Sequence, residues 1–265
     1  MSIYRFVLSA ALITGVAVSH ADVTVTTLTE GKASFINVGG ESVVQIKGQR
    51  QRTDQMLGKR AVTLIIDVDG RRFIDLDAKK KAAVVTPLAV IGDELAKVGV
   101  GTLEATLTKT AQTKQIAGFP CAVHDVRIAL PFSPTGEANQ GMDLNMVLSG
   151  TVCLSTAVPG LADYQAFYRA AADSGFVFGD PRSAKSPTGA AQAKAYAALT
   201  RKMTEAGMIL ESNLTISATG DGPLAGMMAK LAASDLRTTV TNVTTGELPA
   251  EAFEIPADYK VKTQK

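Results

Sequence analysis

The side chains best suited to chemistry in this chain are few. The sequence holds two histidines, His20 and His124, and two cysteines, Cys121 and Cys153. A catalytic triad would have to use His124, because His20 lies in an N-terminal segment that we expect to be removed. A zinc site of the usual kind needs several His or Cys ligands. We therefore expect no enzyme activity, catalytic residue, metal site or cofactor, and we interpret His124 as a structural side chain on the apolar face of a strand.

Four aspartates, Asp67, Asp69, Asp75 and Asp77, are the other candidate ligand group. Nothing near them completes a calcium-binding loop. Asp69-Gly70 instead separates two alternating segments by two residues, the spacing of a tight β-hairpin turn. We therefore predict a hairpin here, not a calcium site.

The first 21 residues predict export. Arg5 precedes the uncharged apolar run 6–18, and Ser19-His20-Ala21 places small residues where a signal peptidase reads them. The run is too short to span a bilayer as a retained anchor. We predict a signal peptide over 1–21 and a single periplasmic domain over 22–265, with no transmembrane anchor after cleavage.

The export signal bears directly on the two cysteines. Disulfides persist outside the cytosol, so we predict a Cys121–Cys153 disulfide, with two free thiols or a redox pair as alternatives. If the two cysteines face each other across a hairpin, three apolar pairs meet on the other face: Leu130/Leu144, Ile128/Met146 and Val126/Leu148. This register would put Asp125, Arg127 and Ser149 on the cysteine face.

The amino-acid composition of the chain narrows the classes of partner that it can bind. The chain is 46% hydrophobic, enough for a sizeable core, and carries 27 basic against 25 acidic residues. Such a balance gives no electrostatic surface for nucleic acid.

Apolar and polar residues alternate along most of the chain, which predicts antiparallel strands with one covered face. The expected strands are 23–28, 32–38, 42–50, 61–68, 71–77, 82–86, 103–108, 119–130, 142–154, 208–218 and 236–244. Helical spacing predicts helices at 87–98, after Pro159-Gly160 with Tyr164 and Tyr168 on its apolar stripe, from 186 to near Gly207, and at 223–233. The order of strands, helices and strands predicts an α+β fold with helices packed on one antiparallel sheet.

Several short motifs resemble a known group. They are IKGQR at 46–50, FIDLD at 73–77, IAGFPC at 116–121, Pro159-Gly160 before a helix, and LPAEAFEIPADYK at 248–260. Together these motifs resemble exported bacterial proteins grouped as domain of unknown function 4412, which are similar to the periplasmic lipoprotein-carrier superfamily. The resemblance covers most of 40–262. It implies a strongly curved antiparallel sheet, an incomplete barrel with helices on its concave face, and no catalytic residues to transfer.

The function we expect is a periplasmic, non-enzymatic binding protein for an apolar ligand, either a lipid or a lipoprotein acyl chain. Flexible apolar side chains are its expected ligand-binding residues, because methionine adapts to irregular ligands. They are Met203, Met208, Leu224, Met227, Met228 and Leu231, which could equally fill the core. The alternative function is a protein-protein interaction or structural module of the bacterial envelope, with Phe176-Val177-Phe178 exposed on a loop as its contact surface.

Overall fold

The computed structural model describes residues 21–264, with gaps at 34–35, 58–59, 97, 101–103, 135–142, 177–196, 198, 222–225 and 227–233. The predicted signal peptide therefore lies outside the described residues, apart from Ala21. So do the predicted helix at 223–233, except Gly226, and the first part of the helix predicted from 186.

The described residues form thirteen strands and few helices. The strands are β1 Val23–Ala33, β2 Ile36–Lys47, β3 Arg50–Leu57, β4 Arg60–Asp67, β5 Arg72–Asp77, β6 Ala82–Pro87, β7 Val98–Val100, β8 Glu104–Ile116, β9 Phe119–Pro134, β10 Asp143–Ser155, β11 Met208–Asp221, β12 Ser234–Thr245 and β13 Lys260–Thr263. The helices are α1 Leu88–Ala96, α2 Leu161–Asp173 and the 3-10 helix η3 Ala250–Phe253. Residues 199–206, directly before β11, are also helical.

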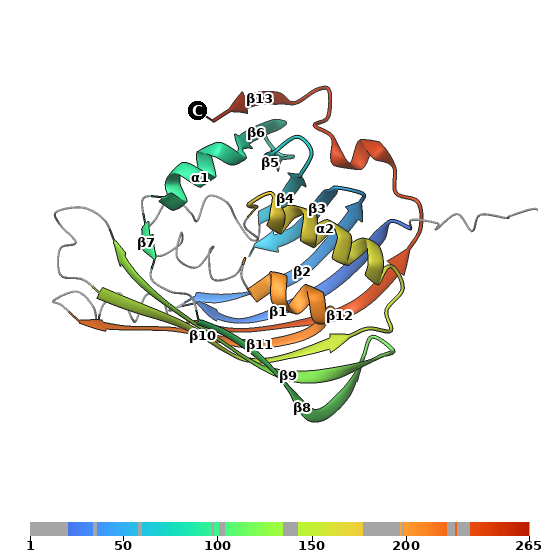
Figure 1. The fold of residues 1–265 in the computed structure, drawn as a ribbon. Helices are drawn as coiled ribbons and strands as arrows, with labels where there is room; N and C mark the ends of the chain where they lie inside the picture. Colours follow the sequence, from blue (N-terminus) through green and yellow to red (C-terminus); the bar gives the residue numbers. More distant parts are fainter. Residues whose placement is uncertain are drawn as a thin grey trace, which may run out of the picture.

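All thirteen described strands belong to one sheet. Its order is β13-β6-β5-β4-β3-β2-β1-β12-β11-β10-β9-β7, and β8 also pairs with β9. Every pair is antiparallel except β13 with β6. The pairing of β1 with β12 joins the N-terminal strands to the C-terminal ones (Figure 1). The predicted single antiparallel sheet is therefore confirmed, apart from the parallel pairing of β13 with β6.

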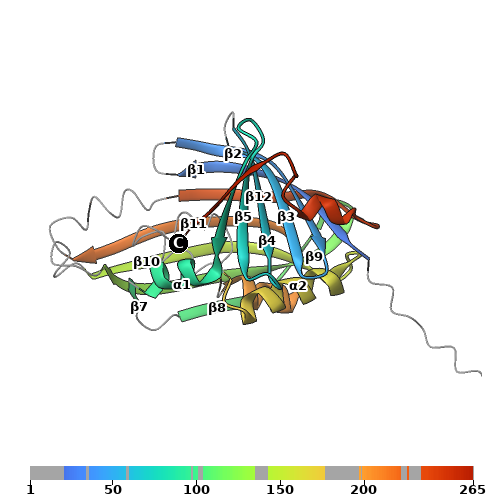
Figure 2. The same ribbon diagram turned by 90° about the horizontal axis from the view of Figure 1, so that it is seen from above.

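Helix α2 packs against the sheet, and we call the sheet face that it contacts the inner face. Figure 1 shows the sheet curving beneath α2. Figure 2, which views the molecule from above, shows the strands spreading apart in a fan. Phe167 and Ala171 of α2 are buried in a core cluster with Val23 and Ile46. Gly160 precedes the helix with φ 74°, and a Cβ there would lie 2.5 Å from Cγ2 of Val23. Only glycine permits this close approach of α2 to β1.

The C-terminal segment covers the outer face of the β4–β6 region. Ile65, Ile74, Leu76, Ala83 and Val85 form a separate buried cluster there, against which Ile255 and Tyr259 pack. Arg52 Nη1 donates to the carbonyl oxygen of Ala252 at 2.8 Å, which holds η3 beside β3. The sequence pattern did not predict η3 or β13.

The turn at Asp69-Gly70 differs from the predicted two-residue hairpin. Asp67 pairs with Arg72, so the connection has four residues, and Arg71 takes the left-handed conformation at φ 49°. The Asp67 side chain makes this turn possible. Its Oδ1 accepts a hydrogen bond from the backbone N–H of Gly70 at 3.0 Å, and its Oδ2 accepts one from Arg72 Nε at 2.8 Å. Asp67 is therefore committed to the turn.

Two further features of the strands differ from the prediction. The strand expected at 32–38 spans the end of β1 and the start of β2, and Gly39-Gly40 lies within β2. A Cβ on Gly39 would lie 2.6 Å from the carbonyl oxygen of Thr29, so this glycine permits close strand packing and does not end the strand. Strand β3 was not predicted as a separate element.

The register of β9 and β10 also differs from the prediction. Leu148 pairs with Ile128 and Met146 with Leu130, two residues away from the expected partners. A shift of two residues keeps every side chain on its face, so the alternating pattern could not distinguish the two registers. The predicted faces hold: Val126 and Ile128 are buried, whereas Asp125 and Arg127 are exposed on the cysteine face.

Candidate ligand-binding cavity

A cavity of about 200 Å³ lies between α2 and the inner face of the sheet. Strands β1, β2, β11 and β12 form its floor, and α2 supplies two tyrosines. Its lining residues are Val25, Thr27, Val44, Tyr164, Tyr168, Ile209, Leu210, Ser212, Thr238 and Val240. An apolar protein cavity of about 150 Å³ is large enough to bind benzene. The cavity therefore has room for a ring or a short stretch of alkyl chain.

Cross-strand pairing brings the floor of the cavity together from distant parts of the chain. Val25 pairs with Val44, and Thr27 pairs with Val240. Ser212 pairs with Thr238. Paired residues of neighbouring strands present their side chains on the same face. The floor therefore depends on β1 joining β12, a contact between the two ends of the described chain.

The two tyrosines stand one helical turn apart on α2. Their ring centroids are 4.6 Å apart. Burial is the main cause that raises the pKa of Tyr164 well above its usual value, and the neighbouring Tyr168 adds to it. Burial likewise raises the pKa of Tyr168 to about 12. Both phenols therefore stay neutral at physiological pH and can act as hydrogen-bonding groups beside an apolar surface.

Three hydroxyl groups break the apolar floor: those of Thr27, Ser212 and Thr238. The hydroxyl of Thr238 lies 3.1 Å from that of Thr29, within hydrogen-bonding distance. Small-molecule pockets typically combine a mostly apolar lining with a few placed polar groups. This cavity has that composition.

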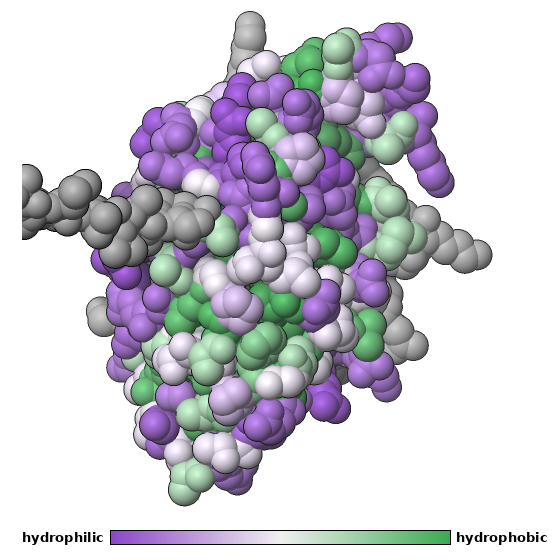
Figure 3. Space-filling model, turned by 90° about the vertical axis from the view of Figure 1, so that its right-hand side faces the viewer, coloured by the Kyte–Doolittle hydropathy of each residue, from purple (hydrophilic) through white to green (hydrophobic). Residues whose placement is uncertain are grey.

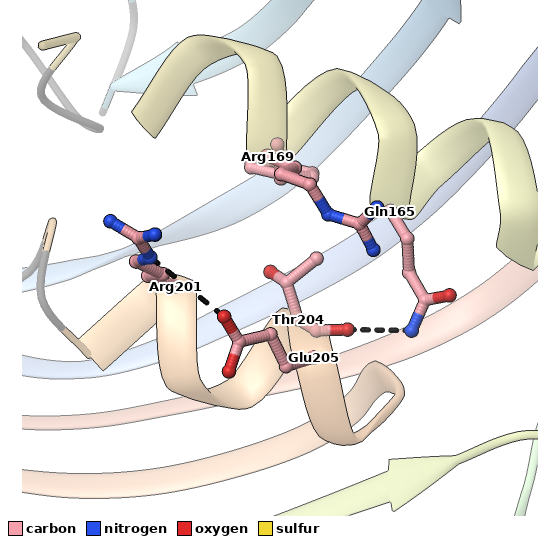
Figure 4. Close-up of a pocket in the computed structure, with 6 residues that line it drawn as sticks. Gln165, Arg169, Arg201, Thr204 and Glu205 are labelled. Carbon is pink, nitrogen blue, oxygen red and sulfur yellow. Dashed lines mark hydrogen bonds and ion pairs between the residues drawn. The ribbon is translucent and has the colours of Figure 1, made fainter. Parts of the chain in front are cut away.

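A second, much smaller cavity of about 10 Å³ lies between α2 and the helical residues 199–206 (Figure 4). Gln165, Tyr168, Arg169, Arg201, Thr204 and Glu205 line it. Gln165 Nε2 donates to the carbonyl oxygen of Thr204 at 2.7 Å and so joins the two helices. Tyr168 borders both cavities. The space suffices for one atom the size of a water oxygen.

The sequence-predicted ligand-binding residues lie elsewhere. Met203 is buried in a cluster with Leu199 and Val126, and Met208 is buried in the main core beside Leu210. Neither lines the 200 Å³ cavity. Leu224, Met227, Met228 and Leu231 lie outside the described residues. The sequence pattern predicted that Tyr164 and Tyr168 lie on the apolar stripe of a helix. That stripe is the sequence feature that could have indicated the wall of the cavity.

The outer face of the sheet carries a different group of residues, which we call the outer clamp: Cys121, Cys153, Glu211, Lys114 and Arg237. Cys121 and Cys153 form a disulfide with their Cα atoms 5.4 Å apart, which confirms the predicted pairing. Cys153 pairs across the sheet with Glu211. The disulfide and the Glu211 carboxylate therefore lie side by side on the face opposite the cavity.

Glu211 is a buried carboxylate with three donors around it. Lys114 Nζ and Arg237 Nη2 form ion pairs with it, the latter at 3.1 Å, and Asn213 Nδ2 donates to it at 3.3 Å. Burial alone would raise the pKa of Glu211, but the hydrogen bonds and charges of Lys114 and Arg237 outweigh it and hold the pKa below its usual value. Because Lys114 lies on β8 and Arg237 on β12, the carboxylate ties the β8–β9 hairpin to the sheet.

The remaining candidates for chemistry show no assembled site. A ring nitrogen of His124, Nδ1, lies 2.9 Å from the carbonyl oxygen of Ala122, and the side chain is half-buried. Within the described ranges, no three His, Cys, Asp or Glu residues are grouped so that they could hold a metal ion.

One side of the molecule is drawn in Figure 3. Hydrophobic residues gather near the middle of this side, and hydrophilic residues surround them. None of the helices in the described part of the chain combines the length and apolar character needed to cross a membrane.

Comparisons with known proteins give distant likenesses. No family model and no curated protein matches the chain. The solved structures that it resembles include PNGF-II, with a TM-score of 0.35 and 9% identity, over 92% of this chain and 31% of that one. A LolA superfamily protein from Nitrosomonas europaea has a TM-score of 0.28 and 7% identity, over 89% and 91% of the two chains. A putative outer membrane lipoprotein-sorting protein domain from Vibrio parahaemolyticus has 0.30 and 11%, over 89% and 90%.

These likenesses are too weak to establish a family or a function for the chain. The chain also spans only 31% of PNGF-II. The resemblance to domain of unknown function 4412 therefore stays a prediction, as do the signal peptide and the periplasmic location.

Proposed function

We propose that this chain is a non-enzymatic periplasmic binding protein for an apolar ligand, a lipid or a lipoprotein acyl chain. The ligand inserts between α2 and the inner face of β1, β2, β11 and β12. The observation that carries the proposal is the 200 Å³ cavity, whose wall is mostly apolar and lies beneath a helix. In this proposal the curved sheet acts as an incomplete barrel, with α2 on its concave face.

The size of the cavity limits how much of an alkyl chain can be buried, and therefore limits the free energy of binding. Each buried methylene contributes about 0.8 kcal/mol, and 1.4 kcal/mol changes a dissociation constant tenfold. The cavity as it stands holds only part of a long acyl chain. We therefore expect α2 to move away from Val44 and Val240 when a longer chain binds, because these side chains form the floor beneath it.

A cavity-filling substitution tests the proposal. Val44→Phe places a larger ring in the cavity, whereas Gln45→Phe places the same ring on the opposite face of β2. We expect Val44→Phe to weaken the binding of a fluorescent fatty acid at least tenfold and Gln45→Phe to leave it within twofold. Circular dichroism of both variants checks that they fold.

Native mass spectrometry of the protein purified from its own periplasm supplies a second readout. We expect a co-purifying lipid in the wild type and a reduced amount in Val44→Phe. If the wild type carries no lipid and binds no fluorescent fatty acid, the proposal is wrong.

The burial of Phe176 weakens the case for the alternative function, a protein-protein interaction or structural module of the bacterial envelope. Phe176 was expected to be exposed as a contact residue, but it is only 1% exposed and its ring lies 5.1 Å from that of Phe73. The reason is the end of α2: the backbone N–H of Phe176 donates to the carbonyl oxygen of Ala171 and folds the chain back onto the core. Val177 and Phe178 lie outside the described residues.

A further inference from the structure

The smaller cavity beside Tyr168 suggests what kind of head group the ligand has. Arg169 follows Tyr168 on α2 and lines this cavity. Figure 4 shows its guanidinium directed toward the space beside Gln165 and Thr204. No acidic side chain of the described residues forms an ion pair with Arg169. An exposed cation without a partner at the rim of a cavity is suited to bind an anion.

Thr204 supplies a second, independent observation. Its side chain is only 4% exposed, and its hydroxyl oxygen has no hydrogen-bond partner. A threonine within a helix commonly bonds to the carbonyl four residues earlier, which this one does not. An unpaired buried hydroxyl costs free energy unless an added atom satisfies it. The 10 Å³ space beside it has room for one such atom.

Arg201, the other cation that lines this space, is shared by two carboxylates. Arg201 Nη2 lies 3.4 Å from the carboxylate of Asp173, and Arg201 Nε lies 3.8 Å from that of Glu205. Within the described residues neither carboxylate forms an ion pair with Arg169, so the Arg169 guanidinium is the cation at this space that an anionic group can pair with.

We propose that the ligand is an anionic, single-chain amphiphile. Its alkyl chain occupies the 200 Å³ cavity, and its head group reaches past Tyr168 to Arg169. One head-group oxygen enters the small cavity and accepts a hydrogen bond from the Thr204 hydroxyl. This inference rests on the proposed function, because it adds a head-group site to the same apolar cavity. Carboxylate and phosphate heads share the chemistry it requires.

The experiment compares three probes with the same alkyl chain: octanoate, octyl phosphate and uncharged octanol. Isothermal titration calorimetry measures each against the wild type, Arg169→Gln, Thr204→Val and the control Arg127→Gln. Arg127 is a matched control because it is exposed on the outer face of β9 and lines neither cavity. We expect at least one anionic probe to bind the wild type more tightly than octanol.

We further expect Arg169→Gln and Thr204→Val each to weaken that anionic probe about fivefold. Octanol binding to Arg169→Gln and every probe's binding to Arg127→Gln should stay unchanged. The ratio between octanoate and octyl phosphate identifies the preferred head. If all three probes bind equally and the variants change nothing, the small cavity holds only water. The inference is then overturned while the apolar cavity stands. If octanol and both anions fail to bind, the proposed function itself is wrong.

Discussion

The polar side chains on the two faces of β11 differ in how they are hydrogen-bonded. On the outer face, Glu211 is surrounded by Lys114, Arg237 and Asn213. On the inner face, the adjacent residue Ser212 lines a cavity. Polar groups that are fully paired inside a protein hold its structure together, whereas polar groups that face a cavity remain available to a ligand. We therefore interpret the outer clamp as structural and the inner face as the side on which the proposed ligand binds.

Removing the disulfide should have the largest effect on the outer clamp. The bridge joins residues 32 apart in sequence, and closing a loop of that length stabilises a fold by roughly 3–4 kcal/mol. We expect the double variant Cys121→Ala, Cys153→Ala to lose about this much free energy of unfolding, measured by urea denaturation. Under conditions where it stays folded, it should bind the fluorescent fatty acid as the wild type does. A variant that is stable but unable to bind would break the separation between the two faces.

Glu211→Gln should have the next largest effect. The substitution keeps the shape of the side chain but leaves Lys114 and Arg237 without their carboxylate. Loss of a buried charged partner costs about 2 kcal/mol, since both cations remain partly exposed to water. Urea denaturation measures this loss. Asp235→Asn is the matched control, because Asp235 is an exposed carboxylate on the neighbouring strand, and it should change stability by less than about 0.5 kcal/mol.

The pH dependence of stability should sharpen the assignment of Glu211. Its pKa in the folded protein lies below its usual value of 4.5. The stabilisation is therefore fully present above the pKa of the unfolded chain and is lost as pH falls through the lower, folded pKa. We expect the wild type to lose more stability than Glu211→Gln between neutral and strongly acidic pH. Parallel profiles for the two proteins, measured by thermal unfolding, would contradict the ion-pair cluster.

The sheet was largely predictable because most strands alternate apolar and polar residues. Strand β3 is the instructive exception. Its inner-face residues Gln51, Thr53 and Gln55 are as polar as Arg52 and Asp54 on the outer face. Such a strand shows no alternation and is held by backbone pairing with β2 and β4. The alternation of apolar and polar residues cannot reveal a strand whose two faces have the same polarity.

The cavity was less predictable than the sheet. The tyrosine stripe of α2 was visible in the sequence, but what it faces depends on β1 pairing with β12, which are far apart in the chain. The methionines were predicted from their adaptability alone, and Met203 and Met208 fill core space instead. Side-chain type does not distinguish a residue that lines a cavity from one that fills it, because both are apolar and covered.

The smallest effect should come from Ser212→Ala, directly beside Glu211. The substitution removes a hydroxyl that faces the cavity and that makes no hydrogen bond to another described residue. Stability should therefore change by less than about 0.5 kcal/mol, in contrast to the loss expected at Glu211. Binding of an uncharged apolar probe such as octanol should be equal or slightly tighter, because the floor becomes more apolar. Urea denaturation and calorimetry measure the two effects. A large loss of stability would show that Ser212 is as deeply committed to the fold as Glu211, and the distinction between the two faces of β11 would then be lost.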